Sequence, residues 1–332
     1  MALTFTSDLL PYDKFLRAGY IEGLTYNVNI LNTMSVGTIR YGSELTEGFK
    51  KTTAYWNDFG KIERRDITSD AAQTSEKITR NEHSDFKTFW KFTPVEWQLT
   101  AFKTSDNMSD GEVMLMIGRK LAEKKLEYTV RRAISLVATA IKSNANMVVT
   151  NADNITVADV VRAKAKFGDA FGRLKALIMH SAAYYTLVAG QITQDKYTKI
   201  GDNLTMYGGQ PATMGVPVIV TDNPELVGES GVYDTLFLTD GAVTLRDNGD
   251  TEFSAGRIHG HENLKSIMQG EGDMWNNVKG YQLKATVGNN PTEEALDTSS
   301  NWEKWDRNDK NTAGVVISSK ADVDAALNAA KA

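Results

Sequence analysis

The longest regular pattern of hydrophobic and polar positions runs from residue 109 to 145. Ser109 and Glu112 form a capping box, and apolar side chains then recur at helical spacing from Val113 to Ile141 without a proline. A helix of about 35 residues would be about 50 Å long at 1.5 Å per residue. The pattern is not a strict heptad, so it predicts a long spine helix and not a coiled coil.

The segment before this helix has a different character. Residues 46–103 carry many charges yet alternate like strands, as in 61–66 and 87–92, which predicts a long two-stranded ribbon with both faces wet. Residues 1–45 mix short apolar pieces with turn residues, and only 11–16 suggests a short helix. We therefore expect 1–45 to be an extended arm that packs on the body of the chain or on a neighbour.

After the long helix, helical and strand-like patterns alternate up to residue 240. Thr156 and Asp159 form a second capping box at the start of a helix. Short apolar runs typical of buried strands follow at 175–180, 216–220 and 235–238, with a helix over 182–188. This alternation predicts an α/β domain with a central sheet.

From residue 241 the pattern becomes β-rich. The Asn248-Gly249 turn predicts a hairpin between 243–245 and 252–253. Further strands are expected at 281–287 and 312–317, and the last dozen residues, 320–332, suggest a short helix or a frayed tail.

Composition narrows the range of functions. The chain has 332 residues, which suggests two domains, and 41% of them are hydrophobic, which excludes disorder of the whole chain. It has 37 Lys and Arg against 42 Asp and Glu, a net charge of −5, which argues against a protein whose main task is to grip nucleic acid. It has no cysteine, which excludes disulfides, zinc–thiolate sites and cysteine nucleophiles.

The sequence shows neither a membrane-spanning stretch nor a secretory signal. No uninterrupted apolar stretch reaches the roughly 18 residues of a membrane-spanning helix, and residues 1–17 lack the basic and apolar regions of a secretory signal. We expect a protein made and used in a cytosol, without a membrane partner.

Candidate catalytic and metal-binding residues are few. His259 and His261 would point the same way on a strand, but no third ligand is indicated, so we favour two ordinary polar residues. Gly208-Gly209 lacks the lysine of a P-loop, and Gly270-Glu271-Gly272 lacks the rest of a dinucleotide fingerprint. We therefore predict no catalytic residue, no metal site and no cofactor.

The long helix carries six basic residues that could suggest a nucleic-acid surface: Arg119, Lys120, Lys124, Lys125, Arg131 and Arg132. Glu123 and Glu127 are interleaved with them, so we favour the solvated face of an amphipathic helix.

Aromatic residues suggest a different kind of partner. Five tryptophans lie outside the obvious core strands: Trp56, Trp90, Trp97, Trp302 and Trp305. Tryptophan is enriched at protein interfaces, so we predict a structural subunit that is completed by contact with copies of itself. The candidate subunit contacts are Lys61, Glu63, Arg64, Arg65, Asp66 and Trp90.

The order of these parts resembles the major capsid protein of tailed bacteriophages, the α+β Johnson fold of Hong Kong phage-like capsids. The stretches 169–181, 215–222 and 290–315 are similar to central and C-terminal parts of that family, and the resemblance covers about residues 1–318. It implies an N-terminal arm (1–45), an extended E-loop (46–103), a peripheral domain with the spine helix (104–150), an axial domain (151–240) and a return to the peripheral domain (241–332).

The resemblance implies a shell subunit that forms hexamers and pentamers of an icosahedral virion capsid, assembled in the host cytoplasm. Expected partners are separate scaffolding, portal and decoration proteins, and packaged double-stranded DNA that is contacted only weakly. Some relatives begin with a scaffolding segment that is later cleaved, and the first residues of this sequence do not resemble one. Other relatives form a covalent link between a loop lysine and an asparagine of a neighbouring subunit. We do not assign that link to Lys61 and Asn289.

Two alternatives stay open at the level of sequence. One is an encapsulin-like, non-viral compartment shell, which the neighbouring genes would distinguish. The other is an α/β enzyme of unknown chemistry, which a pocket with converging polar side chains would support.

Overall fold

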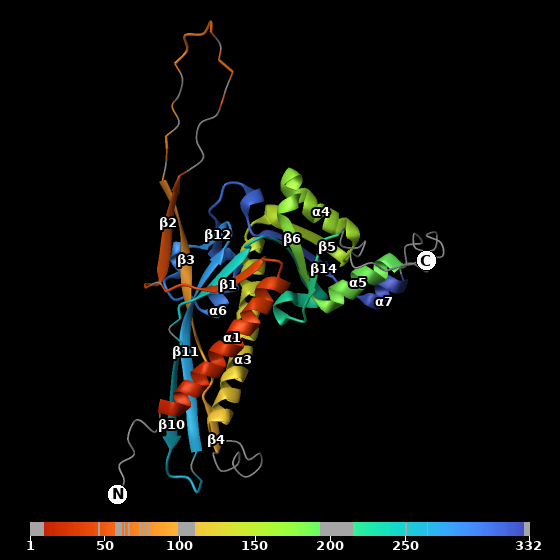
Figure 1. Ribbon diagram of the computed structural model, residues 1–332. Helices are drawn as coiled ribbons and strands as arrows, with labels where there is room; N and C mark the ends of the chain where they lie inside the picture. Colours follow the sequence, from red (N-terminus) through yellow and green to blue (C-terminus); the bar gives the residue numbers. More distant parts are fainter. Residues whose placement is uncertain are drawn as a thin grey trace.

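The computed structural model arranges the chain around two β-sheets, with a hairpin that projects from one of them (Figure 1). The structure describes residues 10–45, 47–56, 62, 64–65, 67–72, 75, 77–78, 80–98, 110–192, 215–249, 251–263 and 265–328. Within these ranges the fold is of the predicted α+β class.

The first sheet has five strands in the order β5-β14-β8-β6-β7. Their bounds are Val148–Asn154 (β5), Gly314–Lys320 (β14), Val232–Thr239 (β8), Leu174–Met179 (β6) and Val218–Val220 (β7). The flanking helices are α4 (Val157–Phe167), α5 (Ser181–Ile192) and α7 (Val323–Asn328). α4 begins with the predicted capping box of Thr156 and Asp159. The predicted α/β domain with a central sheet is thus confirmed.

The second sheet is built on one long central strand, β11 (Lys265–Val278). On one side β11 pairs with β3 (Arg80–Lys91) and then β4 (Val95–Gln98), and on the other with β9 (Val243–Asp247) and then β10 (Glu252–Ile258). The remaining strands are β1 (Ile39–Ser43), β2 (Lys50–Trp56), β12 (Tyr281–Leu283) and β13 (Trp302–Lys304). The result is a long, narrow sheet in place of a compact one (Figure 1).

The hairpin predicted at Asn248-Gly249 is wrong. β9 and β10 do not pair with each other; they follow one another along the same edge of β11. The Asn248 side chain donates a hydrogen bond to Asp273 at 3.2 Å, and Gly249 has a φ of +78°. The turn residues therefore make an interruption within one edge, because β11 offers both segments a partner that is longer than either of them.

Gly270 and Gly272, which fail as a dinucleotide fingerprint, have a packing role in β11. A Cβ on Gly270 would lie 2.7 Å from the Phe253 ring, and one on Gly272 would lie 2.5 Å from the Trp90 ring. Aromatic rings from the two edges of the sheet thus lie directly on the bare backbone of the central strand.

Helix α3 (Asp110–Lys142) is the predicted spine helix. Its second half is almost fully buried between the two sheets and supplies Ile134, Leu136, Val137 and Ile141 to the main core. Ser109 of the predicted capping box lies outside the described residues. The prediction of one long helix in this region is confirmed.

The extended arm predicted for 1–45 is wrong over most of its length, because helix α1 (Leu10–Met34) packs along α3 (Figure 1). The two helices run in the same direction, with Gly19 against Leu115 and Gly118 against Leu16. A Cβ on Gly118 would lie 2.3 Å from the Leu16 carbonyl oxygen. Small residues therefore allow the two backbones to approach more closely than an apolar stripe would.

The last part of the chain contributes to both sheets. Residues 241–332 were expected to contain the continued peripheral domain and C-terminal strands, and of these strands β14 lies in the five-stranded sheet between β5 and β8. Short helix α6 (Glu293–Leu296) and strands β12 and β13 do lie with the long sheet. The last described segment forms α7, in agreement with the expected short helix.

The contact between α1 and α3 gives a direct test. Gly118→Ala should destabilise the subunit by roughly 1–3 kcal/mol, because its methyl group would overlap the Leu16 carbonyl. The matched control is Gly190→Ala in helix α5, where a Cβ meets no atom within 4 Å. That change should be neutral or stabilising by up to about 1 kcal/mol, since alanine has the higher helix propensity. Denaturant unfolding measures both, and equal effects would contradict the close approach.

Candidate functional site

The projecting hairpin is an exposed regular element of the fold. β2 pairs with the first part of β3 in an antiparallel register from Lys50–Phe86 to Trp56–Arg80. Most of its side chains are exposed or half-buried, and the rings of Phe49 and Phe89 meet near its base at 5.9 Å. This confirms the ribbon predicted within 46–103 (Figure 1).

The predicted subunit-contact residues separate into three groups. Arg64 and Arg65 are exposed beyond the paired part of the hairpin and form no ion pair within the described part of the chain. Lys61, Glu63 and Asp66 lie outside the described residues. Trp90 is half-buried, and the Lys125 ammonium lies 4.2 Å from the centre of its ring. A role in subunit contact stays a prediction for all six.

The outer part of the paired strands is held by an aromatic anchor made of Tyr55, His83 and Trp305. The His83 ring stacks on Trp305 at 4.3 Å with 9° between the planes. The Tyr55 ring lies 4.9 Å from Trp305, and its hydroxyl donates a hydrogen bond to the Trp305 carbonyl at 2.9 Å. Residues of both hairpin strands are therefore fixed to one loop of the body.

The expectation that five tryptophans lie outside the core is wrong for Trp97 and Trp302. Trp97 and Trp302 are buried in the cores, and Trp90 and Trp305 pack within the chain. Trp56, in contrast, is 64% exposed on the hairpin. Edge strands and turns supply core residues here because the long sheet is narrow and each short strand has to contribute to its packing.

The six basic residues that suggested a nucleic-acid surface are all paired with carboxylates of the same chain, but the expected solvated face is wrong for Lys125 and Arg132, which are buried. The ion pairs are Arg119–Glu22, Lys120–Glu123, Lys124–Glu127, Lys125–Asp247, Arg131–Glu225 and Arg132–Asp297. The helix therefore presents balanced charge and no basic stripe.

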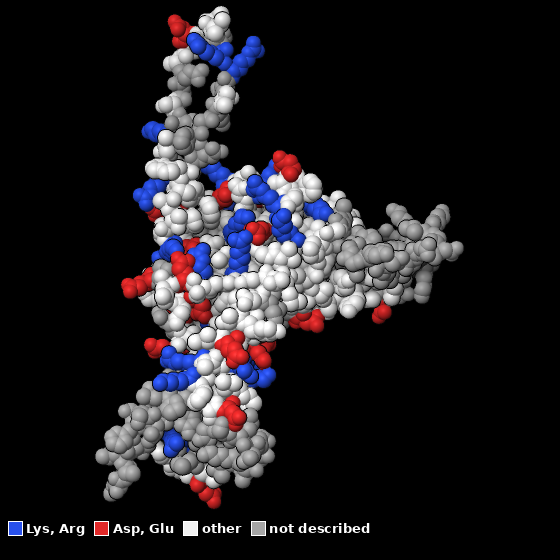
Figure 2. Space-filling model, in the orientation of Figure 1, with Lys and Arg blue, Asp and Glu red and all other residues white. Residues whose placement is uncertain are grey.

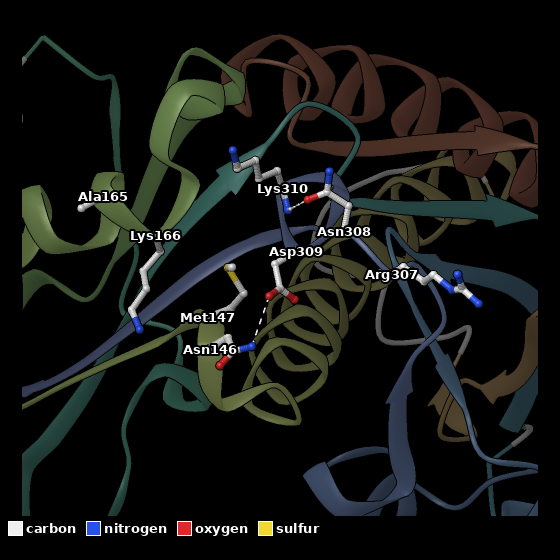
Figure 3. A pocket seen from close by; sticks show the side chains of 8 residues that line it. All are labelled: Asn146, Met147, Ala165, Lys166, Arg307, Asn308, Asp309 and Lys310. Carbon is white, nitrogen blue, oxygen red and sulfur yellow. Dashed lines mark hydrogen bonds between the residues drawn. The ribbon is translucent and has the colours of Figure 1, made fainter. Parts of the chain in front are cut away.

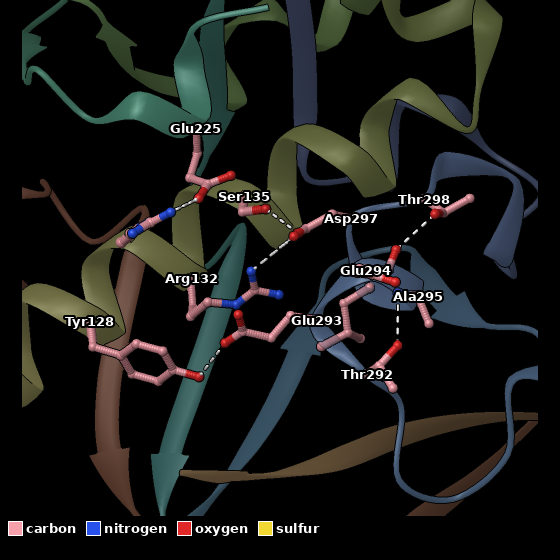
Figure 4. A network of polar contacts seen from close by, with 12 residues as sticks. Tyr128, Arg132, Ser135, Glu225, Thr292, Glu293, Glu294, Ala295, Asp297 and Thr298 are labelled. Atoms are coloured by element: carbon pink, nitrogen blue, oxygen red, sulfur yellow. Dashed lines mark hydrogen bonds and ion pairs between the residues drawn. The ribbon is translucent and has the colours of Figure 1, made fainter. Parts of the chain in front are cut away.

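Polar contacts from the middle of α3 attach it to the segment around α6 (Figure 4). Arg132 and Ser135 both donate to Asp297 after α6, at 3.2 and 2.5 Å. Tyr128 donates to Glu293 at 3.1 Å, and burial, reinforced by that carboxylate, raises the pKa of Tyr128 to about 12. These contacts fix α6 and the strands that follow it against the helix.

One ion pair is enclosed completely. The Lys125 side chain is 1% exposed and pairs with Asp247 on β9. The Tyr41 hydroxyl donates to the same carboxylate at 3.0 Å. Burial lowers the pKa of Lys125, while the charge of Asp247 acts in the opposite direction.

An open cleft of about 710 Å³ lies between the end of α4 and residues 307–310, and we call it the basic cleft (Figure 3). It is lined by Asn146, Met147, Ala165, Lys166, Arg307, Asn308, Asp309 and Lys310. Lys166 and Arg307 lie on opposite sides, with Asp309 between them (Figure 3). Asp309 accepts hydrogen bonds from Lys304 at 2.6 Å, Asn144 at 2.8 Å and Asn146 at 3.2 Å. No sequence pattern indicates this cleft, because its two walls come from distant segments.

The other candidate residues form no centre. His259 and His261 are exposed in the turn between β10 and β11, and the described residues contain no group of three metal-binding side chains. His180 packs against the Tyr233 ring at 4.9 Å, next to the axial sheet. Among the described helices, none is both long and apolar enough to cross a membrane.

Comparisons with known proteins agree with this architecture. The model of a family described as Gp13-like, major capsid protein 13-like, matches residues 8–316. A search of the curated proteins finds no match. A chain of the cyanophage Pam1 capsid asymmetric unit has a TM-score of 0.51 and 10% identity, covering 85% of this chain and 88% of that chain. A chain of Microbacterium phage Oxtober96 has a TM-score of 0.50 and 10% identity, covering 87% and 90%. At such identities these likenesses show the phage capsid fold.

The aromatic anchor should control the mobility of the hairpin. Trp305→Ala removes two ring contacts of about 0.5–1.5 kcal/mol each, so amide hydrogen exchange in β2 and β3 should accelerate roughly tenfold or more. Trp56→Ala, which removes an exposed tryptophan of the same hairpin, is the control and should change exchange little. Equal exchange in the two variants would contradict the anchor.

The loop next to the basic cleft should lose stability in acid. Burial alone would raise the pKa of Asp309, but hydrogen bonds from Lys304, Asn144 and Asn146 hold that pKa below its ordinary value. Its charged form therefore contributes stability that is present above pH about 4 and is lost as the pH falls through the folded-state pKa. Asp309→Asn should thus be less stable than the wild type at pH about 7, with the difference shrinking below pH about 4.

Denaturant unfolding at both pH values measures this difference. The control is Asp306→Asn, because that carboxylate accepts a hydrogen bond from the Asn308 amide at 2.8 Å that asparagine can also accept. A difference for Asp309→Asn that does not depend on pH would rule out the charge as its cause.

Proposed function

Because the chain belongs to the Gp13-like family of major capsid proteins and is a structural subunit of a phage shell, we propose that its copies close into an icosahedral capsid around double-stranded DNA. The observation that carries the proposal is the family match over residues 8–316 of a chain with the phage capsid fold. Its proposed building units are pentamers at the fivefold vertices of the shell and hexamers between them.

The proposal extends to the partners of assembly. Scaffolding is supplied by a separate protein, the shell carries a portal and can take decoration proteins, and assembly occurs in the host cytoplasm. No enzymatic activity is included. Neither the encapsulin-like compartment nor the α/β enzyme gains support from the family match.

The hairpin is proposed as the element that reaches a neighbouring subunit. It projects from the body, its paired strands are held by Trp305, and Arg64 and Arg65 are exposed without a partner in the described part of the chain. Packaged DNA is proposed to be contacted weakly, because the subunit has a net charge of −5 and the Lys and Arg side chains of the spine helix already form ion pairs with carboxylates. Each phosphate that the shell neutralised would oppose release of the genome.

The hairpin prediction is tested by replacing both arginines. Arg64→Ala with Arg65→Ala should lower the yield of closed shells in sedimentation and leave the circular dichroism of the subunit unchanged. Each exposed pair contributes only about 0–1 kcal/mol, but the contact repeats at every copy. Lys120→Ala with Lys124→Ala, two exposed bases paired within the spine helix, should assemble like the wild type. Unaltered shell yield in the arginine variant would refute the role of the hairpin, and a wild type that stays a monomer at every salt and protein concentration would refute the shell.

A further inference from the structure

Basic side chains gather on one face of the molecule, between the base of the hairpin and the five-stranded sheet (Figure 2). In that region the basic cleft adjoins a second basic group formed by Arg40, Arg173 and Lys279. The seven basic side chains of this surface are Arg40, Lys166, Arg173, Lys279, Lys304, Arg307 and Lys310. The carboxylates that pair with members of this surface are Asp240, Asp309 and Asp169, so the basic side chains outnumber the carboxylates paired with them, on a chain whose net charge is −5.

The two groups are joined by contacts through Arg173. Its guanidinium donates to the Asn311 side chain at 2.6 Å and to the Lys310 carbonyl at 3.3 Å, and Lys310 forms an ion pair with Asp169. The pKa of Lys279 is lowered by burial and further by the charges of Arg173 and Arg40, which makes these three side chains electrostatic neighbours.

Some basic side chains of this surface pair with a carboxylate and others do not. Arg40 pairs with Asp240 at 2.6 Å and Lys304 with Asp309 at 2.6 Å. Lys166 and Arg307, on the two sides of the cleft, have no carboxylate partner among the described residues. The spine helix differs, because its seven basic side chains are all paired with carboxylates. The cleft is therefore where positive charge remains available to another molecule.

The lining of the cleft favours a nucleic acid over a protein. Protein interfaces have an apolar centre, whereas protein–DNA interfaces are polar and strongly positive. Six of the eight lining residues are polar or charged, and the two apolar ones are Ala165 and the buried Met147. The planar fork of Arg307 and the ammonium of Lys166 both suit phosphate oxygens.

We infer that the basic cleft contacts the sugar–phosphate backbone of the double-stranded DNA enclosed by the shell. The inference rests on the proposed function and assigns the weak DNA contact to Lys166 and Arg307, with Lys310 and Arg173 beside them. No part of the contact reads a base, so binding is independent of sequence and falls steeply with salt.

The test measures duplex binding by the unassembled full chain. Fluorescence anisotropy with a short duplex of random sequence, between roughly 50 and 200 mM salt, gives the slope of log K against log salt. Lys166→Gln with Arg307→Gln should weaken binding and reduce the magnitude of that slope by about 1.8, about 0.9 for each lost phosphate contact. Lys120→Gln with Lys124→Gln removes the same number of charges from the spine helix and should leave a steeper slope than the cleft variant.

Shell assembly of each variant is measured separately by sedimentation, so that failure of the inference and failure of the shell function are distinguished. Equal DNA binding by the two double variants would overturn the inference, as would a wild type that does not bind the duplex at all. A cleft variant that binds DNA like the wild type but no longer forms shells would assign the surface to a protein partner instead.

Discussion

The enclosed ion pair between Lys125 and Asp247 is the contact on which the arrangement of the other elements depends. It joins the spine helix to β9, the Tyr41 hydroxyl adds β1, and the rings of Trp90 and Tyr20 place β3 and α1 around the same ammonium group. Removing one partner from such a buried pair leaves an uncompensated charge, at a cost of about 3–5 kcal/mol. The pair therefore requires helix, sheet and α1 to meet at one point of the spine.

The other charged side chains of the subunit fall into two groups: those that form ion pairs within the chain and those that remain free to contact other molecules. The Lys and Arg side chains of the spine helix form ion pairs with carboxylates of the same chain, so the body is held together without contacts to another subunit. Two regions differ: the hairpin beyond Trp56, with Arg64 and Arg65, and the basic cleft. A subunit that satisfies its own charges at its centre confines its contacts with other molecules to defined places on its surface.

Elements specified by local pattern were predictable from the sequence, and those specified by distant contacts were not. The spine helix, the capping box at Thr156 and the charged ribbon depend on residues within a few positions of one another. Helix α1 was missed although Leu16, Tyr20, Leu24, Val28 and Leu31 recur at helical spacing and pack against the cores; its glycines add a close approach to α3 that no periodicity indicates. The Asn248-Gly249 turn was misassigned because only β11, which is distant in sequence, decides whether its flanking strands pair. For the site, exposed arginines of the hairpin followed from the pattern, but the cleft joins residues near 166 and 307 and no local signal marks it.

The position of β14 between β5 and β8 has a consequence for biosynthesis. All other strands of the five-stranded sheet precede β14 in the chain, yet β5 and β8 both need it as a neighbour. During translation these two strands therefore keep unpaired edges until residue 320 has left the ribosome. Pairing of residue 148 with 316 also closes a long loop, and topologies of this kind fold slowly. A growing chain therefore cannot present a finished five-stranded sheet to its neighbours, which delays lattice growth until translation has passed this strand.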